Sequence, residues 1–404
     1  MSDWLRAHPE LLLALIKVGA VVFLLLTGVA YLVWFERKVV GHIQSRWGPY
    51  RVGPHGLLQP LADGLKFLFK EDIRHPNVTS PFLYSLAPFL AMTLAMLSIA
   101  VIPFGPDTVE LFGRPTGLYV ADVNIGLLFI LAVTSLGVYG IALAGWSSNS
   151  KYPLLGGLRS AAQLVSYELV LTFSVIGVLL HAGSLRLRDI VEAQGSAWSL
   201  PHWFIFPQIV GFTCFFVSAV AESNRLPFDL PEAETELVAG FHAEYSSFRF
   251  AMFFLAEYAH MITASCLATI LFFGGWHSPF PTTGALGDAT RYFPVAALLG
   301  LALVCLRDLF RLPRPLHRFL MFLLGLGFAS LAWLVAQEPV LTAVQGVFWF
   351  LAKVVVFLFV YVWIRGTLPR FRYDQLMAFS WKFLVPLAVA NVVVTSFIVA
   401  WRAS

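Results

Sequence analysis

The residues best suited to chemistry in this chain are the acids between positions 222 and 257. Seven carboxylates share that stretch with two arginines, which gives a local charge of −5 in a chain of net charge +4. The acids are Glu222, Asp229, Glu232, Glu234, Glu236, Glu244 and Glu257. Apolar runs flank the stretch. Because an ionisable group at membrane depth is costly unless it is solvated, paired or used, the pattern predicts an ion or proton path.

The elements that must position these acids are membrane helices. The 404-residue chain is 58% hydrophobic and 12% charged, whereas soluble domains carry roughly 25% charged residues. Ten apolar runs approach the length of about 20 residues that a spanning helix needs. They lie at 11–35, 82–104, 123–145, 161–182, 203–221, 248–273, 293–309, 319–337, 341–363 and 383–401. Since they do not alternate like barrel strands, we expect an all-α fold, a polytopic membrane helix bundle with about ten transmembrane helices in one domain, 1–404.

The distribution of lysine and arginine predicts the orientation of the bundle. With the N-terminus and the C-terminus outside, 19 of the 27 cationic residues fall in inside loops and six fall outside. The inside loops are then 36–80, 146–160 and 222–247, together with two loops nearer the C-terminus. The first apolar run has no small-residue cleavage pattern after it, so we expect it to be retained. The basic charge follows from this bias and does not imply a nucleic-acid partner.

The first inside loop contains a short amphipathic segment at residues 56–70. Leu58, Leu61, Leu65 and Leu68 share one helical face, and Asp63 lies on the polar face opposite. Such a helix is expected to lie in the plane of the membrane interface. It is either a surface anchor or one lip of a slot through which an amphipathic molecule leaves the bilayer.

Two structural alternatives compete with a proton path. Asp229 and Glu232 have the spacing of a helix capping box, which leaves Glu234 and Glu236 unexplained. If that helix continued, Glu232, Glu236 and Glu244 would share one face, although Gly240 weakens it. Glu168 lies inside an apolar run, where it either handles protons or pairs with a cation from a neighbouring helix.

The cysteines and glycines argue against a bound redox cofactor in this chain. Cys214, Cys266 and Cys305 lie in apolar runs without a CxxC partner, so we expect no metal, no iron–sulfur cluster and no disulfide. The chain has neither a GxGxxG fingerprint nor a Walker A loop.

Five motifs together resemble one family, the quinone-site membrane subunit of NADH-quinone oxidoreductase (respiratory complex I). The family is known as the H subunit in bacteria and as subunit 1 in mitochondria. The motifs occupy residues 36–38 with 41–49, 56–66, 145–152, 221–234 and 365–377. The resemblance covers roughly residues 10–275 and 340–400.

The resemblance implies a subunit that forms the entrance and binding chamber for a quinone such as ubiquinone and couples quinone reduction to proton transport. The quinone-chamber candidates are Arg37, Arg46, Asp63, Arg225 and Phe228. The proton-path candidates are Glu36, Asp63, Glu168, Glu222, Asp229, Glu232, Glu234, Glu236 and Glu257. Expected partners are the peripheral-arm quinone-site and iron–sulfur subunits, the small membrane-arm subunits, lipid, and quinone as substrate. The expected location is the bacterial inner membrane.

The sequence departs from the family pattern in three places. Tyr50 replaces a common asparagine, and His260 does the same after Glu257. A helix pair at 293–337, joined by an arginine-rich turn, is added to the usual eight helices.

Three other functions remain open on the sequence. They are the equivalent subunit of a membrane-bound hydrogenase, a stand-alone cation or proton transporter, and a purely structural anchor for a peripheral arm. Transporters often show internal repeats, which we do not find here. A structural anchor would leave Glu168 and Glu257 without a reason.

Overall fold

The fold is a bundle of long helices, seen in a computed structural model that describes residues 9–403 except 74, 75, 77, 107, 108, 112, 113 and 231–237. The long helices are α2 (Pro9–Ile43), α4 (Pro81–Ile99), α5 (Gly126–Ser147), α6 (Lys151–Ala182), α8 (Ile209–Glu222), α10 (Ser247–Phe272), α12 (Phe293–Arg311), α13 (Pro315–Val335), α14 (Glu338–Thr367) and α16 (Val385–Ala403). The short helices are η1 (Pro54–Gly56), α3 (Gln59–Phe69), α7 (Leu187–Glu192), η2 (Leu200–His202), η3 (Gly240–His242), α11 (Ala285–Arg291), α15 (Tyr373–Phe379) and η4 (Ser380–Leu384). Two short antiparallel strands, β1 (Val109–Leu111) and β2 (Arg114–Thr116), complete it.

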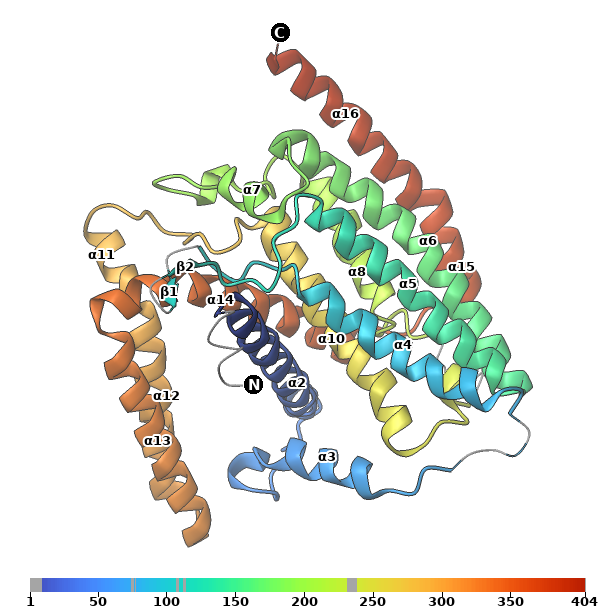
Figure 1. Ribbon diagram of the computed structural model, residues 1–404, viewed down its shortest axis with the longest axis horizontal. Coiled ribbons are helices and arrows are strands. Elements are labelled where there is room, and N and C mark those ends of the chain that lie inside the picture. Colours follow the sequence, from blue (N-terminus) through green and yellow to red (C-terminus); the bar gives the residue numbers. More distant parts are fainter. Residues whose placement is uncertain are drawn as a thin grey trace.

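Every predicted apolar run carries a helix, so the prediction of a polytopic helical membrane protein is confirmed. Within the described ranges, nine helices are long and apolar enough to span a bilayer, and α8 is a shorter apolar helix. We call the end of the bundle that carries α3 the inner end (Figure 1).

Two predicted boundaries were wrong. The run at 203–221 becomes helical only at Ile209, because Pro207 lacks the amide donor that a helix interior needs. The loop predicted at 146–160 is mostly helix, since α6 begins at Lys151. The apolar run marks only the apolar part of a helix. The N-terminal turns of α6 contain the charged residues Lys151 and Arg159, so they lie outside the apolar run although they are helical.

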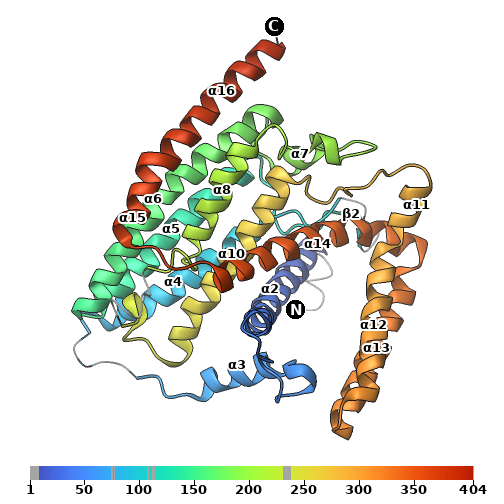
Figure 2. The same ribbon diagram turned by 180° about the vertical axis from the view of Figure 1, so that it is seen from behind.

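Helix α10 forms the centre of the bundle, as both views show (Figures 1 and 2). In its most apolar window 72% of the residues are buried, against 11% for α2 and 17% for each of α12 and α13. It packs against α2, α4, α8 and α14. Polar groups on α10 are therefore held inside the protein, away from lipid.

The added helices α12 and α13 form a hairpin that stands beside the bundle (Figures 1 and 2). They pack mainly on each other and reach the rest of the chain through α14 and η1. One polar contact joins the hairpin to the segment before α3, where His55 Nε2 lies 3.0 Å from Asp308 Oδ2.

Candidate functional site

A large chamber opens at the inner end of α2. Its volume is about 810 Å³, and its walls come from α2, the loop after it, α14 and the segment after α8. The polar or charged lining residues are Glu36, Arg37, Gln44, Arg46 and Arg365. Two cations predicted from the sequence, Arg37 and Arg46, thus face one space. Arg37 Nη1 donates to Asp63 Oδ2 at 2.8 Å, which ties helix α3 to the wall.

The loop that follows α2 is ordered and irregular, as its glycines and prolines predict. Gly48 has a φ of 61°, and a Cβ there would lie 2.9 Å from the carbonyl oxygen of Arg37. Only glycine fits such a close approach with a positive φ. The loop therefore folds back onto α2, so that Arg46 lines the same chamber as Arg37.

Helix α3 matches the predicted amphipathic segment, with Pro60 in its first turn. The apolar side chains Leu58, Leu61, Leu65 and Leu68 are all exposed. Helix α3 lies apart from the main bundle at its inner end (Figure 2), where a membrane interface or a neighbouring subunit would cover its apolar face.

Three helices converge on Glu36, which is only 7% exposed. Arg365 of α14 donates to one carboxylate oxygen. Tyr258 of α10 donates its hydroxyl to Oε2 at 3.0 Å. The sequence does not reveal the contacts of Arg365 and Tyr258 with Glu36, because nothing local links residues that lie hundreds of positions apart.

Arg225 lies behind the chamber and forms the next contact inward. Its Nη2 is 3.7 Å from Glu257 Oε2, and its guanidinium lies 4.0 Å from the centre of the Tyr258 ring. Leu226 is part of the chamber wall, whereas Arg225 is not among the described residues that line the chamber. Arg225 thus connects Tyr258, which faces Glu36, with Glu257.

Phe228 packs in the protein interior. Its ring stacks on Phe371 with centroids 5.6 Å apart and also meets Tyr167 at 5.7 Å. Among the described lining residues of the chamber, Phe228 does not occur. Its observed contacts are those of a side chain that holds the segment after α8 in place.

A smaller cavity gathers three of the predicted acids. It has a volume of about 40 Å³, and Glu168, Glu222 and Glu257 reach it from α6, α8 and α10. Ser135 of α5 donates its hydroxyl to Glu168. In the part of the chain that the structure describes, no lysine or arginine pairs with Glu168, so the predicted ion-pair alternative is not observed there. We call this space the carboxylate cavity.

The remaining acidic candidates divide into two groups. Asp229 accepts a hydrogen bond from Arg370 Nη2 at 3.0 Å. Glu232, Glu234 and Glu236 lie outside the described residues. The expected capping box of Asp229 with Glu232 therefore stays a prediction.

A continuous helix through Glu244 is wrong for the described end of the segment. After residue 238 the chain makes only a 3-10 turn, η3, with positive φ at Val238 and Gly240. The conformational freedom of Gly240 permits this break.

The described residues offer no evident metal site. No group of three His, Cys, Asp or Glu side chains gathers among them as it would around an ion. Cys214, Cys266 and Cys305 are unbonded and buried.

Fold and site together define a polytopic helical membrane protein whose inner chamber leads through paired charges to buried carboxylates. A family model described as NADH dehydrogenase matches residues 16–396. The NADH-quinone oxidoreductase H subunit 2 of Koribacter versatilis (strain Ellin345) is 53% identical, and the match covers 97% of this chain and 98% of the relative. The H subunit 1 of Solibacter usitatus (strain Ellin6076) is 51% identical, covering 96% and 97%. The H subunit of Thermomicrobium roseum (strain ATCC 27502 / DSM 5159 / P-2) is 44% identical, covering 99% and 98%. The chain belongs to this family, the membrane-embedded H subunits of NADH-quinone oxidoreductase, respiratory complex I.

Proposed function

We propose that this chain forms the entrance and chamber for the quinone with a partner subunit, and that it couples quinone reduction to proton translocation. The names of its relatives support the quinone reaction over the hydrogenase and transporter alternatives. The inner chamber supports such a role, since Arg37 and Arg46 line it and Arg37 is hydrogen-bonded to Asp63 of the amphipathic helix α3.

The chamber residues suit a quinone headgroup. Guanidinium groups donate hydrogen bonds to carbonyl oxygens and stabilise negative charge that develops on them during reduction. Arg37 and Arg46 would serve this purpose, while Asp63 holds Arg37 in position. The electrons would come from an iron–sulfur cluster in a peripheral-arm subunit, because this role requires none in the chain itself.

The contact series from Glu36 to Glu257 carries the proposal. Glu36 lines the chamber and accepts from Tyr258, Tyr258 lies under Arg225, and Arg225 meets Glu257 in the carboxylate cavity. A new negative charge in the chamber shifts the balance of these paired charges, and Glu257 responds by changing its protonation. Glu168 and Glu222 then exchange that proton onward. Glu232, Glu234 and Glu236 would supply protons from the inner side.

Replacement of Tyr258 tests this coupling. Tyr258→Phe keeps the ring under Arg225 and removes the hydroxyl that binds Glu36. We expect proton translocation coupled to quinone reduction to fall about tenfold, on the order of 1.4 kcal/mol. The measurement is quinone reduction and acidification by the assembled enzyme in sealed proteoliposomes.

Tyr167→Phe is the matched control, since Tyr167 is also buried and donates to a backbone carbonyl, that of Leu376. Wild-type translocation in Tyr258→Phe, with the control also unchanged, would refute the coupling route.

A further inference from the structure

The turn of the added hairpin carries a cluster of cations that has no role in the route above. All four of its arginines are exposed, and they are Arg307, Arg311, Arg314 and Arg318. One acid, Asp308, lies among them, so the local charge is +3. The turn lies at the inner end of the bundle, as both views show (Figures 1 and 2). We call residues 307–318 the arginine turn.

Contacts within the protein hold two of these arginines in place. Arg318 Nε donates to the carbonyl oxygen of Leu312 at 2.6 Å, and Arg307 Nε lies 3.2 Å from Asp308 Oδ1. Asp308 is 6% exposed, and its other carboxylate oxygen lies 3.0 Å from His55 Nε2. The one acid of the arginine turn is therefore buried and shared, and it neutralises only part of the cationic charge.

The arginines repel one another because they are close together. Arg307 and Arg311 are four residues apart in α12, a spacing at which like charges destabilise a helix. The contact of Arg318 with Leu312 brings the first turn of α13 beside the end of α12. An anion bound here would relieve the repulsion. Clusters of about four to eight basic residues next to the cytoplasmic end of a transmembrane helix are typical of sites for anionic lipid headgroups.

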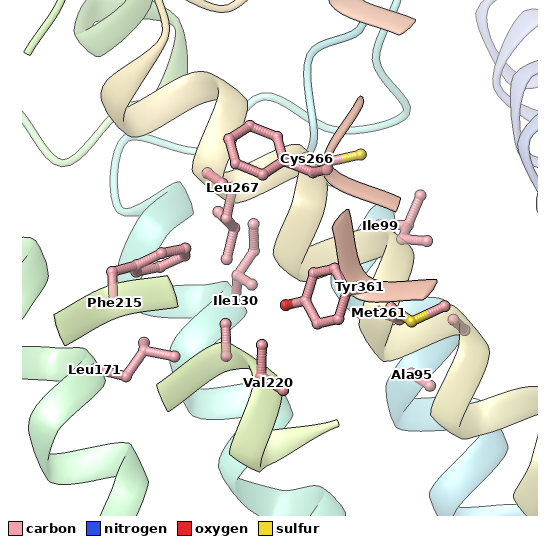
Figure 3. Close-up of a cluster of buried hydrophobic side chains, with 14 of the residues drawn as sticks. Ala95, Ile99, Ile130, Leu171, Phe215, Val220, Met261, Cys266, Leu267 and Tyr361 are labelled. Atoms are coloured by element: carbon pink, nitrogen blue, oxygen red, sulfur yellow. The ribbon is translucent and has the colours of Figure 1, made fainter. Parts of the chain in front are cut away.

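Each helix of the hairpin also presents a stripe of exposed apolar side chains that leads toward the arginine turn. The members are three or four residues apart, which places them on one helical face. The α12 stripe is Leu299, Leu303, Leu306 and Phe310, and the α13 stripe is Leu316, Phe319, Leu323 and Leu326. Apolar side chains of the bundle, in contrast, pack on one another in its interior (Figure 3). Within the described residues, the two stripes are left uncovered.

An anionic phospholipid matches both features at once. Helices α12 and α13 have 19 and 21 residues, close to the length of about 20 that spans the hydrocarbon core, so their turn lies at the membrane interface beside lipid phosphates. Acyl chains would run along the stripes. A free phosphate ion would compensate the arginines and leave the stripes uncovered. An apolar helix of another subunit would cover the stripes and leave the arginines without an anion.

We propose that the α12–α13 hairpin binds an anionic phospholipid from the leaflet at the inner end of the bundle. Arg311 and Arg314 hold the phosphate by charge-assisted hydrogen bonds, and the two stripes hold the acyl chains. The site is separate from the inner chamber and from the carboxylate cavity. It therefore stands or falls independently of the proton route proposed above.

Photochemical labelling of the assembled enzyme tests this proposal. The enzyme is placed in phosphatidylcholine nanodiscs that contain a small fraction of phosphatidylglycerol with a photoreactive group on one acyl chain. After illumination, mass spectrometry of the peptides measures the labelling of α12 and α13. A phosphatidylcholine probe with the same photoreactive chain is the comparison. We expect phosphatidylglycerol to label the hairpin about fivefold more or better, since each arginine near a membrane surface contributes about fivefold in affinity for anionic lipid.

Three double variants locate the source of this preference. Arg311→Gln with Arg314→Gln should lose at least about fivefold of it, whereas Arg311→Lys with Arg314→Lys keeps both charges and should retain most of it. Lys151→Gln with Lys382→Gln is the matched control, because it removes two exposed cations that lie on α6 and η4, outside the hairpin. The control should keep the wild-type preference.

Four results would overturn the proposal. Equal labelling by the two probes in wild type would show that the hairpin does not select an anionic lipid. An equal fall in the glutamine variant and in the lysine control would show attraction to the basic surface in general. A hairpin labelled by neither probe would show that another subunit covers it. Loss of the preference on addition of inorganic phosphate, at constant ionic strength, would assign the arginine turn to free phosphate. If the glutamine variant does not assemble, the wild-type comparison and the Arg→Lys variant decide.

Discussion

Single polar side chains hold this bundle together where water is excluded. Lys353 of α14 donates from Nζ to three backbone carbonyls, those of Phe273, Gly275 and His277, at 2.6, 2.9 and 2.7 Å. Its ammonium also lies 4.4 Å from the Trp203 ring centre. A buried cation that satisfies several carbonyls fixes the turn after α10, because each unpaired group would carry a desolvation cost.

His277, in that same turn, makes stability depend on pH. Burial, and then the charge of Lys353, lower the pKa of the His277 imidazole below its ordinary value. The folded state therefore keeps the ring neutral, while the unfolded chain takes up a proton below about pH 6.5. Its stabilising effect is complete above that pH and is lost as the pH falls, at most about 1.4 kcal/mol per pH unit.

Thermal unfolding of purified wild type and His277→Gln between pH 7.5 and 5.5 measures this effect. Wild type should lose more stability than the variant across the range. Parallel curves for the two proteins would contradict the assignment.

Close helix packing positions the segment that follows the acidic stretch. Gly156 of α6 lies against the backbone of η3, and a Cβ there would come within 2.7 Å of the amide nitrogen of Phe241. Phe241 and Tyr245 are buried in the core beyond this contact. A small residue on α6 therefore sets how deeply the chain after residue 237 enters the bundle.

Gly156→Ala should displace η3 from α6. We expect a loss of about 1–3 kcal/mol of stability from overpacking and reduced quinone reduction, since Phe241 and Phe253 also line the carboxylate cavity. Thermal unfolding and activity of the assembled enzyme provide the measurement. Gly64→Ala is the control, because a Cβ at Gly64 meets no atom within 4 Å; equal effects of both substitutions would refute the packing argument.

The α12–α13 hairpin makes few contacts with the rest of the described chain. It meets the loop before α3 through packing of α13 on η1 and through Asp308 of α12, which is 6% exposed and lies next to His55. Since that loop borders the inner chamber, the added pair is attached to the chamber side of the protein and not to the carboxylate cavity.

Asp308→Ala should loosen the hairpin. We expect trypsin cleavage at the exposed arginines of the α12–α13 turn to accelerate about tenfold, as the loss of one polar contact worth on the order of 1.4 kcal/mol allows. Asp288→Ala on α11 is the control. Equal cleavage rates in both variants and wild type would show that the contact does not anchor the hairpin.

The orientation of the whole chain, with both termini outside the bacterial inner membrane, remains a prediction from its charge bias. A membrane-impermeant maleimide added to intact cells should label Ser196→Cys and spare Lys66→Cys. The native cysteines are buried, which keeps the background low. The reverse labelling pattern would invert the topology.

Much of the architecture followed from local composition. An apolar run of spanning length commits a segment to a helix, because lipid offers no partner for backbone groups. That is why even the short run at 293–309 is helical. The boundaries failed where proline or polar residues separate the helix from its apolar part, as at Pro207 and Lys151.

The sequence also contained every acid of the carboxylate cavity as a candidate, because a glutamate in an apolar run is unusual wherever it sits. It did not reveal that Tyr258 and Arg365 meet Glu36, or that His260 lines two cavities. Those relations depend on the rotation and tilt of helices packed against one another, and packing is a property of pairs of helices far apart in the chain. Hydrophobic length is local and readable in one segment; the meeting of side chains exists only once the bundle has formed.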